Sequence, residues 1–407
     1  MNLQDNNHYI EYLNTKDSDE ILYKNQPNIR FKENIINDFN FSYWICDTFD
    51  IYYPSNEKDQ KELYLIYSFL YNKEINILRV TDKKIIKSLS GHSNFISKVK
   101  NFYNEKDNNN YLLSSDWSHT LIVWNLDNNY EIKYKIFTGY TNYLFSFLLY
   151  FKLNYIITST IGHDEEIDYL KIYSFGNGEL IKDFLHTDVI ETLDLMIWEK
   201  ESNEIYIVMC CYEKISIYNL LNGELYCDLS PDIQESCGNY YFSGFISYNN
   251  KYLFTSSSEG YINIWDLSQK ILIKTIILPE SSLFKIIPWS VYINYSKDKN
   301  DLKLYRNINN YILVCDKKKL GIFNINIIFR NEIDYNEITN KIYELSEEVF
   351  YQHKVLSFFK NKDNQPIKMI KKIKHPLYQD SILCSGENKN IDLWINNPPI
   401  MIDVFNK

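Results

Sequence analysis

The feature that most restricts how this chain can fold is a four-residue pattern: apolar, any residue, apolar, large. It recurs along the 407 residues at Ile75–Leu78, Leu121–Trp124, Leu170–Tyr173, Ile215–Tyr218, Ile262–Trp265, Leu320–Phe323 and Ile391–Trp394. The last residues of successive copies are 45 to 49 positions apart through the fifth copy, and then 58 and 71 positions apart. Alternation with a period of two residues indicates a β-strand with a buried face. We therefore predict one β unit repeated seven times.

Each copy follows a second apolar run across a short polar turn, which predicts a β-hairpin. These runs are Leu63–Ser68, Tyr111–Ser115, Tyr155–Ser159, Tyr206–Cys210, Tyr252–Ser256, Tyr311–Cys315 and Ser381–Ser385. A further run follows most hairpins, as at Lys84–Gly91, and another precedes them, as at Leu144–Tyr150 and Val355–Lys360. Four strands per unit predict an all-β fold, a seven-bladed β-propeller of four-stranded antiparallel blades.

We place the propeller at residues 31–407, after a polar N-terminal segment at residues 1–30. Either Ile10–Tyr23 or Pro399–Phe405 is expected to supply the strand that closes the ring. The longer spacing of the last two units is assigned to polar insertions on the surface. These insertions are Tyr295–Asn310, Asn331–Glu348 and Lys360–Ile373.

Composition agrees with a folded β protein and restricts its partners. The chain is 45% hydrophobic and 16% aromatic and contains no alanine, the best helix former. Its formal net charge of −10 disfavours binding to duplex nucleic acid or to a membrane. Seven scattered cysteines without a CxxC pair, and a first segment without an apolar run, predict a cytoplasmic protein, with the nucleus as a second location.

Two sets of residues resemble the WD-repeat family of propellers. Gly91-His92 precedes Trp124 by about the interval that separates Gly-His from Trp-Asp in that family, and Trp265-Asp266 is the dipeptide itself. The resemblance covers roughly residues 31 to 407 and is stronger in period and strand pattern than in exact motif. It implies a propeller whose loops hold other proteins.

The family also carries a hydrogen-bonded chain of His, Ser or Thr, Asp and Trp within a blade. The resemblance implies these roles for His92, Ser114 and Trp124, and structural roles for Trp265, Asp266 and Trp394. Counting back six residues from Trp124 reaches Ser118 where the family has Asp. No unit is therefore expected to have the full set, and aromatic packing is expected to supply most of the stability.

Sequence motifs for chemistry are not found. The seven histidines lie in different predicted blades or turns, so we expect no metal site and no cofactor. There is no GxSxG, P-loop or GxGxxG motif, so the chain is not expected to be an enzyme. A propeller enzyme stays as the third hypothesis. The second is a ribonucleoprotein assembly factor that contacts RNA through the basic run Lys368–Lys374.

The first hypothesis is a non-catalytic scaffold that binds peptides or protein subunits on one rim of the propeller. Its candidate residues lie in the predicted loops and hairpin turns of that rim: Asn94, Trp117, Asn142, Asp188, Tyr212 and Lys318. Trp117 stands out because an aromatic residue among polar ones is a frequent anchor for a partner. The alternative is that Trp117 packs against the adjacent turn.

Overall fold

A computed structural model describes the fold over part of the chain. The described residues are 29–32, 48–54, 62–68, 71–79, 82, 84–139, 144–160, 168–186, 192–200, 203–211, 214–230, 241–247, 250–257, 260–277, 283–294, 305–316, 319–324, 342–344, 354–360, 367–375, 379–386, 390–394 and 402–403. All the regular secondary structure among them is β-strand, which confirms the predicted all-β class. The chain divides into two compact units, residues Phe39–Asp228 and residues Met1–Asp38 with Leu229–Lys407.

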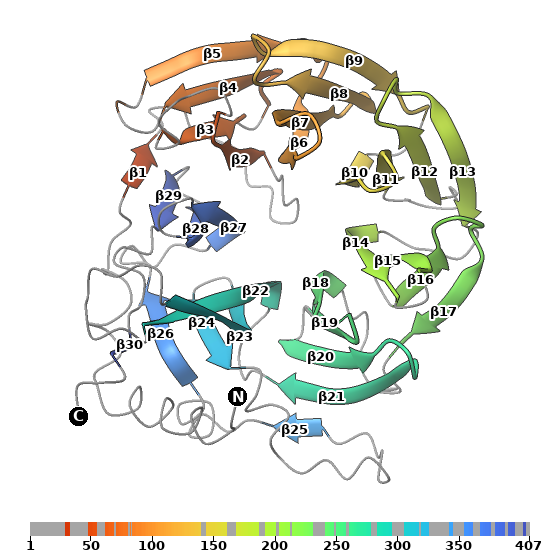
Figure 1. Cartoon of the computed structure of the whole chain (residues 1–407), viewed down its shortest axis with the longest axis vertical. Helices are drawn as coiled ribbons and strands as arrows, with labels where there is room; N and C mark the ends of the chain where they lie inside the picture. The colour runs from red at the N-terminus through yellow and green to blue at the C-terminus, as the bar shows by residue number, and fades with distance from the viewer. Residues whose placement is uncertain are drawn as a thin grey trace. The chain divides into compact units, whose positions relative to one another are not determined.

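The unit Phe39–Asp228 holds four antiparallel sheets, each made of four strands consecutive in the described sequence (Figure 1). The first contains β2 (Phe49–Tyr52), β3 (Tyr64–Tyr67), β4 (Glu74–Arg79) and β5 (Lys84–Ser90). The second contains β6 (Ile96–Asn104), β7 (Asn109–Asp116), β8 (Thr120–Asn125) and β9 (Glu131–Phe137). The third contains β10 (Leu144–Tyr150), β11 (Tyr155–Thr160), β12 (Asp168–Ser174) and β13 (Leu180–His186), and the fourth β14 (Thr192–Glu199), β15 (Ile205–Cys211), β16 (Ile215–Asn219) and β17 (Leu225–Leu229).

The other unit holds three sheets among its described residues. The first has the order β18 (Tyr241–Ile246), β19 (Tyr252–Ser257), β20 (Tyr261–Asp266), β21 (Ile271–Ile277) and β25 (Ile342–Glu344). The second has the order β26 (Lys354–Lys360), β24 (Lys319–Asn324), β23 (Tyr305–Asp316), β22 (Leu283–Asn294) and β30 (Ile402–Asp403). The third has the order β1 (Ile29–Lys32), β29 (Asn390–Trp394), β28 (Gln379–Gly386) and β27 (Ile367–His375).

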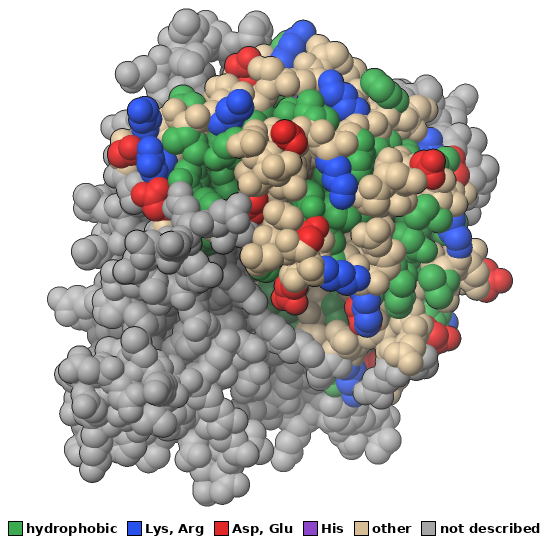
Figure 2. Space-filling view, turned by 45° about the horizontal axis from the view of Figure 1, so that its top comes forward, with side chains coloured by type: hydrophobic (Ala, Val, Ile, Leu, Met, Phe, Trp, Pro, Cys, Tyr) green, Lys and Arg blue, Asp and Glu red, His purple; other side chains and the backbone are tan. Residues whose placement is uncertain are grey.

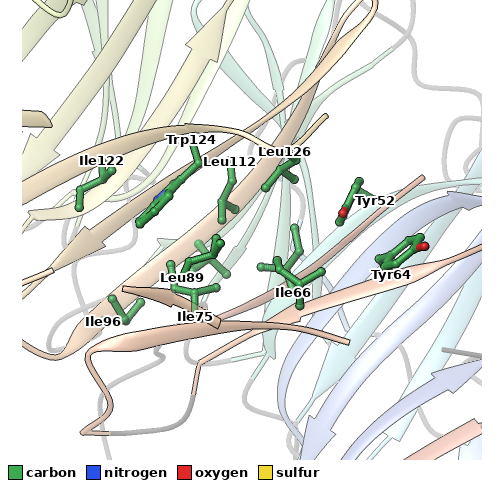
Figure 3. Packing of buried hydrophobic residues seen from close by; sticks show 12 residues of the cluster. Tyr52, Tyr64, Ile66, Ile75, Leu89, Ile96, Leu112, Ile122, Trp124 and Leu126 are labelled. Atoms are coloured by element: carbon green, nitrogen blue, oxygen red, sulfur yellow. The ribbon is translucent and has the colours of Figure 1, made fainter. Parts of the chain in front are cut away.

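Every predicted hairpin is confirmed, because the second and third strands of all seven units pair in antiparallel register. These strands are stabilised by burial of both faces, because successive side chains point to opposite sides and enter different clusters. Leu112 and Ile122 pack into a cluster shared with β2–β5, whereas their neighbours Leu113 and Val123 pack into a cluster shared with β10–β12. Figure 3 shows Trp124 in the first of these clusters, which also contains Ile122.

The order of strands in the last two units differs from the prediction. Val355–Lys360 was predicted to precede and pair with the last hairpin, but β26 pairs with β24 and follows that earlier hairpin instead. The strand that pairs with β28 is β27, so the predicted insertion Lys360–Ile373 is wrong from Ile367 onward. The basic run Lys368–Lys374 lies on this strand, at the edge of its sheet.

The other predicted insertions also contain strands. β23 begins within the predicted insertion Tyr295–Asn310, and β25 lies within Asn331–Glu348. The last sheet receives its fourth strand from the N-terminal region, because β1 pairs with β29. The candidate Ile10–Tyr23 lies outside the described residues, and the candidate Pro399–Phe405 contributes β30, which pairs with β22 in a different sheet.

Candidate functional site

Of the six predicted rim residues, Asn94 and Trp117 are described by the structure. Three turns meet at their position. The Trp117 N–H donates to the Phe95 carbonyl at 2.9 Å, which joins the β7–β8 turn to the β5–β6 loop. The Ile96 N–H donates to the Asn72 carbonyl at 2.9 Å, which joins the start of β6 to the β3–β4 turn. The other four predicted residues lie outside the described residues: Asn142, Asp188, Tyr212 and Lys318.

Three aromatic side chains pack edge to face where these turns meet. The ring centroids of Trp117 and Phe95 are 5.7 Å apart, those of Trp117 and Tyr71 6.1 Å apart, and those of Tyr71 and Phe95 5.2 Å apart. All three residues are partly exposed. We call Tyr71, Phe95 and Trp117 the aromatic triplet. Trp117 thus packs against neighbouring turns, as the alternative prediction stated, and still presents part of its surface.

A buried hydrogen-bonded chain lies beneath the triplet. The Trp124 Nε1–H donates to Ser114 Oγ at 2.8 Å, and Ser114 Oγ lies 2.7 Å from His92 Nε2. His92 Nδ1 lies 3.1 Å from Asp116 Oδ2. With its hydrogen directed to Nε2, the Ser114 hydroxyl accepts from Trp124 and donates to His92, and His92 Nδ1 in turn contacts the Asp116 carboxylate. The structure therefore links the three residues that the WD-repeat resemblance singled out, and ends their chain on Asp116.

Asp116 corrects the prediction that the acid is missing. Its Oδ1 accepts from the Ser118 N–H at 3.0 Å, the Ser118 hydroxyl at 2.8 Å and the Thr120 N–H at 3.0 Å. Its Oδ2 accepts from the Ser93 N–H at 3.2 Å and the Asn94 N–H at 3.3 Å. Counting back from Trp124 gave Ser118, two positions too late, because the count assumed a fixed turn length.

The electrostatics of this site favour an ionised Asp116. Burial by itself raises the pKa of its carboxyl, and the hydrogen bonds from His92, Ser118 and Thr120 lower it by more, so the pKa lies well below its usual range. The side chain is fully buried. A buried carboxylate with several donors holds the loops that supply those donors in one arrangement. Asp116 therefore fixes the β5–β6 loop and the β7–β8 turn, which carry Phe95 and Trp117 of the triplet.

The contacts from Ser114 to His92 to Asp116 have the order of a Ser-His-Asp hydrolytic triad. Their burial decides whether they could act on a substrate. The Ser114 side chain is 0% exposed and its oxygen already accepts from Trp124. A nucleophile must reach its substrate. We therefore assign this set a structural role. Among the described residues, no group of three or more His, Cys, Asp or Glu side chains is arranged to hold a metal ion.

A shorter version of this hydrogen-bonded chain occurs in the sheet that contains β20. The Trp265 Nε1–H donates to Thr255 Oγ1 at 3.0 Å, and Thr255 precedes Trp265 by the same ten residues that separate Ser114 from Trp124. Asp266 Oδ1 accepts from the N–H groups of Ser268 and Gln269, at 2.9 Å each, and so shapes the turn into β21. The side chain of Trp394 lies outside the described part of the chain.

Sequence reasoning missed Tyr71, Phe95 and Asp116. A signal for Tyr71 was present, since it precedes Leu78 by seven residues and Trp117 precedes Trp124 by the same interval. The two aromatics therefore occupy equivalent turn positions in neighbouring units. For Phe95 the printed sequence offered only its place after Gly91-His92.

Comparisons with known proteins add no relative to this description. Neither a scan against protein-family models nor a search of curated proteins found a match. In the part of the chain that the structure describes, no helix has the length and apolar character needed to cross a membrane.

Proposed function

We propose that the chain is a seven-bladed propeller of the WD-repeat type and acts as a non-catalytic scaffold in the cytoplasm or nucleus. In this proposal the loops of one rim hold peptides or subunits of a larger complex. The repeated four-stranded sheets and the His92–Ser114–Trp124 hydrogen bonds support the family assignment. The sheets support a fold that presents loops on a rim, and the aromatic triplet supports partner binding by those loops.

The observation that carries the functional proposal is the aromatic triplet on its rigid base. Aromatic residues supply large contact areas at low cost in conformational entropy, and they are enriched among the residues that dominate binding energies. Exposed polar residues adjoin the triplet in the same loop and turn, including Ser93 and Ser118, whose hydroxyls lie 2.8 Å apart. A partly exposed apolar centre with a polar rim is the usual composition of a protein–protein interface.

Affinity purification followed by mass spectrometry tests this proposal with two matched variants. Trp117→Ser removes an aromatic of the triplet, whereas Phe137→Ser removes an aromatic that is 78% exposed on the outer strand β9. We expect Trp117→Ser to deplete partners that both the wild type and Phe137→Ser retain. A partner set that is unchanged in Trp117→Ser would refute binding at the triplet.

A further inference from the structure

A short strand reaches from one sheet to the outer edge of another. β24 and β26 pair with each other, and β25 lies between them in the sequence. β25 nevertheless pairs with β21, in parallel, from Thr275 with Ile342 to Ile277 with Glu344. Figure 1 draws β25 beside β21 and apart from β26. The chain therefore leaves one sheet, adds Ile342–Glu344 to the edge of a second sheet, and returns to the first.

This covered edge differs from its counterparts in three other sheets. In β5, β9, β13 and β21 the register with the preceding strand shifts at the same place, so equivalent positions hold Ser88, Lys135, Asp183 and Thr275. The first three residues are exposed, and no strand pairs with the outer side of β5, β9 or β13 among the described residues. Thr275 is 3% exposed. We attribute the burial of this position to β25.

The outer strands also differ in charge. β21 contains one charged residue in Ile271–Ile277, namely Lys274, whereas β5, β9 and β13 contain two or three each. On the face that Figure 2 draws, Lys and Arg side chains are interspersed with hydrophobic ones. Charged side chains on an edge strand oppose pairing with other chains. The edges of β5, β9 and β13 thus carry their own protection, and β21 has β25 instead.

The contact between β25 and β21 has few stabilising interactions and one unfavourable one. It consists of three residue pairs, and parallel pairing is slightly less stable per residue than antiparallel pairing. Lys274, next to the covered residues, is 6% exposed, and burial lowers the pKa of its ammonium. Moving a charged group out of water costs free energy. We therefore expect β25 to open more readily than the antiparallel strands of the sheet separate.

A sheet of this kind is complete without a fifth strand. The sheets that contain β5, β9 and β13 each consist of four strands. The Thr275 hydroxyl donates to Asn263 Oδ1 at 2.8 Å, as Ser88 does to Asn76 Oδ1 at 2.7 Å in the sheet that ends with β5. Because these hydrogen bonds run to the preceding strand, opening the outer side of β21 leaves them in place.

We propose that Ile342–Glu344 form a removable strap, which closes over the outer edge of β21 and opens without unfolding the sheet. The closed strap covers an edge that has a single charge, and it ties together the two sheets that contain β21 and β24. The open strap exposes the backbone of Thr275–Ile277 and the side chain of Lys274. The strap thus controls when this edge is available for pairing.

Acetylation kinetics, followed by mass spectrometry of the full chain, test the proposal. Acetic anhydride reports how often Lys274 is exposed, and Lys87 is its equivalent on the uncovered β5. An open state of this kind is populated at about 0.1–10%, so in the wild type we expect Lys274 to react about tenfold to a thousandfold more slowly than Lys87. In the double variant Ile342→Pro, Tyr343→Pro, which removes two backbone donors of the strap, Lys274 should react at the rate of Lys87.

A matched control and a peptide separate the strap from other causes of slow reaction. The double variant Ile402→Pro, Asp403→Pro breaks another parallel pair, β30 with β22, and should leave Lys274 slow. The N-acetylated peptide Ile-Tyr-Glu-Leu-Ser has the sequence of residues 342–346 and contains no lysine. At millimolar concentration, which is the order of the effective concentration of a tethered segment, it should restore slow reaction of Lys274 in the first variant.

The proposal is overturned if Lys274 reacts as fast as Lys87 in the wild type, if it stays slow in the first variant, or if the peptide does not restore slow reaction. Rapid reaction of Lys274 in a folded control variant also overturns it, because the effect would not be local. A first variant that fails to fold by circular dichroism overturns it as well, since a removable strap is not needed for folding. Dimers of the wild type that the first variant abolishes would overturn the assignment of the strap to the same chain.

Discussion

Replacing Asp116 by asparagine should destabilise the protein strongly while preserving the shape of the side chain. The two carboxylate oxygens of Asp116 face separate groups of donors, with Ser118 and Thr120 on one side and His92, Ser93 and Asn94 on the other. An amide has one acceptor and one donor end. In either orientation its NH₂ group must face a set of donors.

The size of the loss follows from the number of affected hydrogen bonds. A hydrogen bond to a charged group contributes about 1.5–3 kcal/mol, and a buried donor left without an acceptor costs about 1–3 kcal/mol. Because the affected donors share one acceptor, their energies are not additive, and we expect a total loss of about 3–5 kcal/mol. At about 2–4 °C per kcal/mol, the melting temperature should fall by roughly 6–20 °C. Ser118→Ala removes one exposed donor to the same carboxylate and should cost about 1 kcal/mol or less.

The difference between wild type and Asp116→Asn should also depend on pH. The pKa of Asp116 in the folded protein lies below its unfolded value of about 3.9, so the folded state binds the proton less readily. The stabilisation is then fully present above about pH 4 and is lost as pH falls through the folded pKa. The two proteins should therefore differ by a constant amount between pH 7 and pH 5, and by less at pH 3.

Thermal unfolding followed by near-UV circular dichroism measures both effects. Amide hydrogen exchange adds a local readout, because the N–H groups of Ser93 and Asn94 should exchange faster in the variant than in the wild type. A loss below about 1 kcal/mol, or a difference that grows toward pH 3, would refute the role assigned to the carboxylate.

Two further predictions concern the glycines and the N-terminal strand. Gly223 and Gly139 both have positive φ, but an added Cβ would lie 2.1 Å from the Phe184 ring at Gly223 and in open space at Gly139. Gly223→Ala should therefore lower the free energy of unfolding by at least about 2 kcal/mol, and Gly139→Ala by about 1 kcal/mol. Equal losses in chemical denaturation would contradict this explanation. Deleting residues 1–33, which removes β1, should lower the melting temperature by several degrees more than deleting residues 1–25, and equal melting temperatures would show that β1 contributes nothing.

The hairpins were predictable because both faces of their strands are buried. At Leu112–Leu113 and Ile122–Val123, neighbouring residues enter different clusters, so both faces of these strands favour apolar residues. Burial of this kind leaves a continuous signal in the sequence. The signal identifies a strand and its hairpin partner, since the partner is adjacent in the chain.

The pairing of β26 was not predictable in the same way. The apolar run at Val355–Lys360 indicated a strand but not its partner, and the long separation from β24 removed the local cue of a short turn. β27 was missed because its closely spaced lysines, as at Lys372 and Lys374, make an edge strand resemble a polar insertion. The pairing of strands that are far apart in the sequence depends on how the whole fold packs, so the sequence of either strand does not reveal it.

The hydrogen-bonded chain was predictable in three of its members and not in its acid, and of the aromatic triplet only Trp117 was predicted. His92, Ser114 and Trp124 were identified from the resemblance and contact one another as it implied. Asp116 was missed because the hydrogen-bonded position depends on the path of the backbone through the turn. Positive φ at His119 is part of that path, and a residue count cannot report it.

An experimental density map of the full chain tests the central claim most directly. We expect seven sheets arranged radially around one axis, with β1 paired to β29 and the triplet of Tyr71, Phe95 and Trp117 on the rim. Two sheets packed face to face, or a number of radial sheets other than seven, would contradict the propeller and the scaffold role proposed for its loops.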